Sequence, residues 1–127
     1  MHALTAEWVA KAEGDFASAR RELRARRDPN YDSACIHAQQ TAEKYLKAFL
    51  QEQGATMPRT HNLIELLRLC SPIEPLFHSQ QSDLILIDRY AVSYRYPGDS
   101  ADKEEARQAV RATSSVRAFI LGMLGLK

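Results

Sequence analysis

The chain has 127 residues, of which 45% are hydrophobic and 26% are charged, as expected for one globular domain over residues 1–127. Its 17 basic residues nearly cancel its 16 acidic ones, so the net charge of +1 excludes a generally cationic, histone-like nucleic-acid binder. The 18 Ala and 14 Leu far outnumber the 4 Val and 6 Ile. Because Ala and Leu favour helices and β-branched residues favour strands, the composition predicts an all-α domain.

The chain shows no targeting or membrane segment. Its first twenty residues mix Trp and Ala with charged side chains and lack the apolar run of a signal peptide. No segment approaches the roughly 20 apolar residues that cross a bilayer, so we expect a cytoplasmic protein without membrane spans. Cys35 and Cys70 lie in helix-like patterns without zinc-type spacing. We therefore expect buried reduced thiols and neither a metal nor a cofactor.

Two long helices are predicted in the first half of the chain. Apolar side chains recur every three or four positions over residues 5–27, after which Asp28 and Pro29 break the pattern. A second helix is predicted over residues 32–53, ending at Gly54, which suits the left-handed conformation beyond a helix end. At about 1.5 Å per residue each helix is ~30 Å long, so the two should pack antiparallel.

Three further helices are predicted in the second half. Thr60 is the expected N-cap of a short helix that ends before Pro72. A fourth helix is predicted over residues 76–96, and Ser100 is the expected N-cap of the last. The inner face of the fourth helix is predicted to consist of Leu84, Ile87, Ala91 and Tyr94. Together these elements predict an up-and-down bundle of four or five helices.

The densest group of polar and aromatic residues lies at the end of the fourth predicted helix, whereas familiar catalytic signatures and metal-ligand clusters are absent from the sequence. An arginine at a helix end can hold a phosphate while a base stacks on a tyrosine. The alternative is that the arginine satisfies terminal carbonyls and the tyrosines fill the core. The candidate nucleotide- or phosphate-binding residues are Arg95, Tyr96, Arg89, Tyr94 and Asp88.

Other polar residues have mainly structural interpretations. The run over residues 20–27 holds five arginines, which we expect to be solvated and to complement the helix dipole, with phosphate-backbone binding as the alternative. His37 and His61 are expected to be hydrogen-bonded cap or core histidines. Lys44 and Lys47 are expected on a solvated helix edge.

Three blocks occur in an order that resembles a known family. They are residues 36–48 (IHAQQTAEKYLKA), residues 60–67 (THNLIELL) and residues 94–97 (YRYP), preceded by Trp8 and Asp15 in the first predicted helix. Over nearly the whole chain this pattern resembles the HEPN domain, named for nucleotide binding in higher eukaryotes and prokaryotes. The resemblance implies a four- or five-helix bundle that forms a homodimer and pairs with a minimal nucleotidyltransferase, in a two-component or toxin–antitoxin system.

The sequence departs from one pattern of that family. Many relatives are metal-independent ribonucleases that use an arginine followed, after four to six residues, by a histidine. No arginine stands five to seven positions before any of the four histidines here, and the corresponding positions after Arg89 hold Tyr94, Arg95 and Tyr96. Arginine and tyrosine have ordinary pKa values far above neutrality, which disfavours them as general acids or bases.

The sequence therefore favours a helical nucleotide-binding module that is non-catalytic or weakly catalytic, with no assigned catalytic residue. In this hypothesis Arg95 contacts phosphate, Tyr94 or Tyr96 stacks on a base, and Asp88 orients an arginine or accepts a ribose hydroxyl. One alternative is a ribonuclease toxin with an unusual site. Another is a pure interaction module whose contact surfaces are the small-residue faces of the second and last helices, Ala34, Ala38, Ala42, Ala106 and Ala109.

Overall fold

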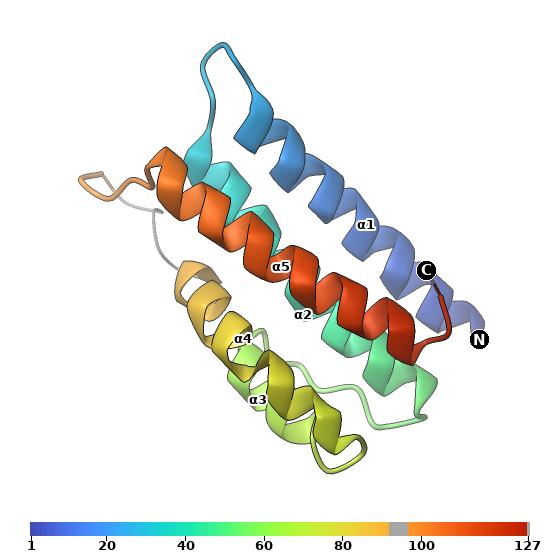
Figure 1. Cartoon of the computed structure of the whole chain (residues 1–127). Helices are drawn as coiled ribbons and strands as arrows, with labels where there is room; N and C mark the ends of the chain where they lie inside the picture. Colours follow the sequence, from blue (N-terminus) through green and yellow to red (C-terminus); the bar gives the residue numbers. More distant parts are fainter. Residues whose placement is uncertain (92–96, 127) are drawn as a thin grey trace.

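Three long helices, α1 (Ala3–Arg24), α2 (Tyr31–Glu52) and α5 (Lys103–Met123), make up most of the fold. In this computed structural model, which describes residues 1–91 and 97–126, the three lie side by side (Figure 1). α1 runs antiparallel to both α2 and α5. The predicted antiparallel pairing of the first two helices is thus confirmed.

Two short helices cover the side of α2 and α5 that faces away from α1 (Figure 1). They are α3 (Leu63–Cys70) and α4 (Gln81–Asp88), and α4 is flanked by the 3-10 turns η1 (Pro75–Gln80) and η2 (Arg89–Ala91). The described residues contain helices and turns but no strand, which confirms the predicted all-α bundle.

The fourth predicted helix is not one continuous α-helix. The first turns of the segment are the 3-10 helix η1, with Pro75 at its start and the Ser79 hydroxyl bonded to the Leu76 carbonyl. Tight 3-10 turns are common at the ends of α-helices, which explains why the periodic pattern did not reveal them. On the inner face Leu84 and Ile87 are buried as predicted, whereas Tyr94 lies outside the described residues.

α2 is the central helix of the core. More than half of its residues are buried, because α1, α3 and α5 pack around it. Phe77 of η1 closes the core at the α3–α4 side, with its ring 4.6 Å from that of Phe49 and 4.9 Å from that of Phe119. Thr113 of α5 donates a buried hydrogen bond of 2.8 Å to the Ala38 carbonyl of α2.

The helix ends agree only in part with the predicted caps. Gly54 adopts a left-handed φ of 72° after α2, as predicted. α3 is capped by Asn62, whose side chain accepts from two backbone amides, and not by Thr60. α5 is capped by Asp102 in a capping box with Glu105, and not by Ser100. In both cases the residue with a glutamate three positions later is the cap, as the capping-box motif requires.

The small-residue faces of α2 and α5 are internal seams. Ala34 and Ala38 pack with Ala106 and Ala109 around Tyr90, and all four alanines are fully buried within a single chain. Ala42 is also fully buried. The prediction that these alanines form a contact surface for a partner is therefore wrong, because no part of them is accessible.

Cys35 and Cys70 are free and buried, in agreement with the expected thiols. Burial raises the pKa of each thiol to about 12, so both are protonated near neutral pH. Among the described helices none is both long and apolar enough to cross a membrane.

Candidate functional site

The end of α4 is fixed to the start of α3 by Asp88. The carboxylate of Asp88, the last residue of α4, accepts a 2.9 Å hydrogen bond from the backbone amide of Leu63, the first residue of α3. An amide in the first turn of a helix has no partner within that helix, so this side chain supplies one. Asp88 thus has a structural role that the sequence did not indicate.

Arg89 begins the 3-10 turn that follows, and its side chain is exposed. Its guanidinium carbon lies 5.9 Å from the ring centroid of Tyr90, within the range of a cation–π contact. Tyr90 is only 1% exposed and packs among the alanines of α2 and α5. The arginine is therefore held at the end of α4 by a ring that is itself anchored in the core.

The other predicted site residues, Tyr94, Arg95 and Tyr96, lie outside the described residues. Of the five candidate residues, the structure therefore describes Asp88 and Arg89, which are neighbours in the sequence.

A second polar cluster joins three helices around Glu13 of α1. The Glu13 carboxylate accepts from the Tyr45 hydroxyl (2.6 Å) and from Nε and Nη2 of Arg117 (2.6 and 2.7 Å). The hydrogen bonds from Arg117 lower the pKa of Glu13 despite its partial burial. Burial and the bond to Glu13 raise the pKa of Tyr45. The cluster ties α1, α2 and α5 together, and it was not predicted.

Both histidines of the resemblance blocks bind carboxylates that also bind a lysine. Nδ1 of His37 is 3.0 Å from Oδ1 of Asp15, whose other oxygen accepts from Lys44. In the second cluster, Nδ1 of His61 is 2.8 Å from Oε2 of Glu43, and that oxygen also accepts from Lys47 at 3.0 Å.

These contacts correct the sequence interpretation of the two lysines. Lys47 is 5% exposed and its ammonium lies 5.7 Å from the centroid of the Trp8 ring, so it is not on a solvated edge. Lys44 is partly buried against Asp15. The hydrogen bonds predicted for His37 and His61 are confirmed, but the predicted cap or core position is wrong for His61, whose side chain is 75% exposed and which does not cap α3. The described part of the chain holds no group of three or more His, Cys, Asp or Glu side chains suited to a metal ion.

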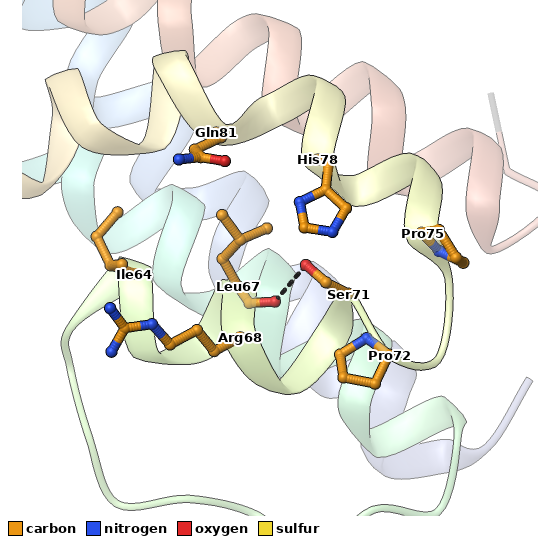
Figure 2. Close-up of a pocket in the computed structure, with 8 residues that line it drawn as sticks. All are labelled: Ile64, Leu67, Arg68, Ser71, Pro72, Pro75, His78 and Gln81. Carbon is orange, nitrogen blue, oxygen red and sulfur yellow. Dashed lines mark hydrogen bonds between the residues drawn. The ribbon is translucent and has the colours of Figure 1, made fainter.

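A hollow of about 480 Å³ lies between α3 and the η1–α4 segment (Figure 2). Figure 2 shows Arg68 and Leu67 of α3 on one side and His78 and Gln81 on the other. The Ser71 hydroxyl donates to the Leu67 carbonyl at 2.8 Å, so it is engaged with the backbone. The residues that line this hollow include no carboxylate. His78 in this hollow therefore has no carboxylate among the lining residues to orient it as a general base.

The all-helical arrangement of the described residues agrees with the bundle that the family resemblance implies. A family model described as HEPN domain matches residues 5–123. The chain belongs to the HEPN domain family. The matched residues include all five α-helices except the first two residues of α1.

Two solved structures share this HEPN fold. The archaeal HEPN homologue ST0689 has a TM-score of 0.74 at 22% identity, covering 94% of this chain and 96% of the other. TT1696 from Thermus thermophilus has a TM-score of 0.76 at 21% identity, covering 91% and 94%. At this identity the two structures establish the fold. A search of curated proteins gave no match.

Within the HEPN domain, the first two resemblance blocks hold the Lys47–Glu43–His61 cluster and the cap of α3. They also supply His37 and Lys44, whose carboxylate partner Asp15 lies in α1. The contacts that Glu13 and Asp15 make with neighbouring helices were not predicted. Both lie beside positions of the apolar stripe of α1, and this could have indicated that their side chains reach a neighbouring helix.

Proposed function

We propose that this HEPN domain is a nucleotide- or RNA-binding module that contacts phosphate at the end of α4. The observation that carries the proposal is the placement of Arg89, an exposed guanidinium held over the buried Tyr90 ring. A guanidinium supported by a fixed neighbour loses less conformational entropy when it binds an oxyanion. Arginine also matches phosphate geometry with two parallel N–H donors.

Four further residues belong to the proposed site. Arg95 supplies a second phosphate contact, and Tyr94 or Tyr96 stacks on the base. Asp88 contributes by holding the end of α4 against α3, through its bond to the Leu63 amide. In this proposal the domain binds a nucleotide or RNA and does not catalyse a reaction on it.

The proposal includes a homodimer that works with a minimal nucleotidyltransferase in a two-component or toxin–antitoxin-like system. Support for an association surface comes from the α3–α4 side, where large apolar side chains are 44–59% exposed. These side chains are Leu69, Ile73, Leu76 and Ile85. Exposed apolar residues in one region are typical of protein contact surfaces.

Calorimetric titration with ATP and other nucleotides tests the binding site. We expect wild-type protein to bind at least one nucleotide, and we expect Arg89→Ala and Arg95→Ala each to weaken binding roughly tenfold or more. Arg68→Ala is the matched control, because Arg68 is an exposed arginine on α3. The site is wrong if wild type binds no nucleotide, or if Arg95→Ala binds as tightly as wild type.

Incubation of purified protein with RNA in the presence of EDTA tests the absence of catalysis. We expect the RNA to remain intact, because neither tyrosine nor arginine is a good general acid or base near neutral pH. RNA cleavage that is lost in Arg89→Ala would instead establish a metal-independent ribonuclease.

A further inference from the structure

An arginine-lined trough lies between α1 and α5, on a different face from the end of α4. Its hollow has a volume of about 450 Å³, with Arg20 on the α1 wall and Arg107, Arg111 and Arg117 on the α5 wall. Figure 1 shows that α1 and α5 run side by side with nothing covering them on this face. On α5, Ala106 and Ala109 pack against Tyr90, so the trough and the end of α4 use different faces of that helix.

Phe16 at the base of the trough positions two of these arginines. The guanidinium carbons of Arg20 and Arg117 lie 5.6 Å and 4.9 Å from the Phe16 ring centroid. Phe16 is only 7% exposed, so its ring serves these contacts and has little surface left on which a base could stack. Such an arrangement holds guanidinium groups in place but cannot read bases.

The charge of the trough is only partly balanced. Arg117 is paired with Glu13, and Arg107 is 3.2 Å from the exposed carboxylate of Glu104. Arg20 and Arg111 form no ion pair within the part of the chain that the structure describes. Two opposed cations on neighbouring helices therefore face an open hollow, and Arg24 lies one turn beyond Arg20 on α1.

The trough continues along α5. A second hollow of about 300 Å³, lined by Glu104, Arg107, Gln108 and Arg111, shares two arginines with the first. Arg107 and Arg111 are neighbours at i and i+4 on α5, about 5–6 Å apart, so the positive charge extends along the helix beyond a single point. Guanidinium groups spread along two neighbouring helices match a chain of regularly spaced phosphates better than they match one mononucleotide.

We propose that this trough binds the sugar-phosphate backbone of a nucleic-acid strand without base specificity. The cations of the trough are all arginine, which suits phosphate recognition. Phe16 and Val110 of the apolar floor are less than a tenth exposed and only Leu23 among the apolar lining residues is partly exposed, so the trough offers little of the apolar surface on which protein interfaces depend. The observations therefore favour a nucleic-acid backbone over an acidic polypeptide.

Fluorescence anisotropy with a labelled oligouridine tests the proposal, using Arg20→Gln/Arg111→Gln and the control Arg59→Gln/Arg68→Gln. Both doubles remove two exposed arginines, but the control pair lies outside the trough. We expect the trough double to bind roughly tenfold more weakly than wild type at low salt, and the control to bind like wild type. For the trough double variant, the slope of log affinity against log salt concentration should also be shallower than that of wild type by about 1.4, because each lost phosphate contact on a single strand contributes about 0.7 to the slope.

Three outcomes would overturn the proposal that the trough binds nucleic acid. Wild type could fail to bind oligouridine at low salt, or the two doubles could lose affinity equally. In a third outcome, polyglutamate could bind wild type as tightly as oligouridine does. Circular dichroism of each variant confirms that it is folded. If Arg89→Ala weakens oligouridine binding while the trough double variant does not, the trough proposal fails and the proposed site at the end of α4 stands. If the trough double variant weakens binding while Arg89→Ala does not, the trough proposal stands and the site at the end of α4 fails.

Discussion

Glu13 shows how much a single side chain contributes to the assembly of this domain. Its two oxygens accept hydrogen bonds from Tyr45 of α2 and from Arg117 of α5. Hydrogen bonds to charged groups stabilise a fold more than neutral ones, but side-chain exposures of 38% for Glu13 and 29% for Arg117 reduce the gain through solvent screening. We place the contribution of the cluster at about 1–2 kcal/mol.

Glu13→Gln should therefore lower the free energy of unfolding by about 1–2 kcal/mol near pH 7. Because the pKa of Glu13 is lowered by folding, its contribution is present above the ordinary value of 4.5 and is lost as the pH falls through the folded value. The difference between wild type and Glu13→Gln should thus shrink on acidification. Urea unfolding at pH 7 and at pH 3.5 measures it.

Glu7→Gln is the control for this prediction, because Glu7 is an exposed carboxylate on the same helix. Its stability should stay close to that of wild type at both pH values. A Glu13→Gln deficit that is the same at pH 7 and pH 3.5 would show that the carboxylate charge is not what stabilises the cluster.

At the scale of the helices, the caps decide where each element begins. Asp102 accepts from the Glu105 amide at 2.8 Å, and the Glu105 side chain accepts from the Asp102 amide at 3.2 Å. Asp102→Ala should lower the free energy of unfolding by about 1 kcal/mol, since it leaves an amide of the first turn without its partner. Thermal and urea unfolding measure this change.

Ser100→Ala provides the matched comparison. Ser100 lies two residues before the observed cap, so its substitution should change the stability by less than about 0.5 kcal/mol. A larger loss in Ser100→Ala than in Asp102→Ala would move the start of α5 to the position expected from the sequence.

The helices themselves were predictable because each long one has a strong apolar period. The buried residues Ala12, Phe16 and Ala19 of α1 follow one another at intervals of four and three, the spacing that predicted the helix. Caps were harder, because Ser100 and Asp102 are equally good by residue type and only the glutamate three positions later distinguishes them. The 3-10 turns η1 and η2 could not be predicted from the spacing of the apolar residues, because that spacing does not specify the local backbone geometry.

Of the candidate site, the sequence identified the exposed Arg89 but not the bond from the Leu63 amide to Asp88. That bond joins residues 25 positions apart, and a single sequence has no signal for such a pairing. The trough was equally difficult to anticipate, because Arg20 and Arg111 come close only once α1 packs beside α5.

For the whole molecule, the distribution of apolar surface predicts how copies associate. The α3–α4 side exposes Ile73 and Leu76 at 44% and 59%, whereas the seams between α2 and α5 are closed. We predict that light scattering shows a dimer and that Ile73→Ser/Leu76→Ser shifts it toward the monomer, because polar side chains weaken an apolar contact.

Leu4→Ser is the control for the dimer, since Leu4 is also exposed, at 56%, but lies on α1. This variant should associate like wild type. A wild-type protein that is monomeric at all concentrations would remove the homodimer from the proposed function, while leaving the two phosphate sites to be judged by their own tests.

The contact between Trp8 and Lys47 gives this domain an internal optical reporter. Trp8 is the only tryptophan in the chain, and it lies where α1 meets α2, two helical turns before Phe16. Its emission therefore follows the separation of those two helices, while far-ultraviolet ellipticity follows the melting of every helix. If the two unfolding curves coincide, the bundle opens as one cooperative unit. If the emission changes first, the detachment of α1 also dismantles the arginine trough before the rest of the domain unfolds.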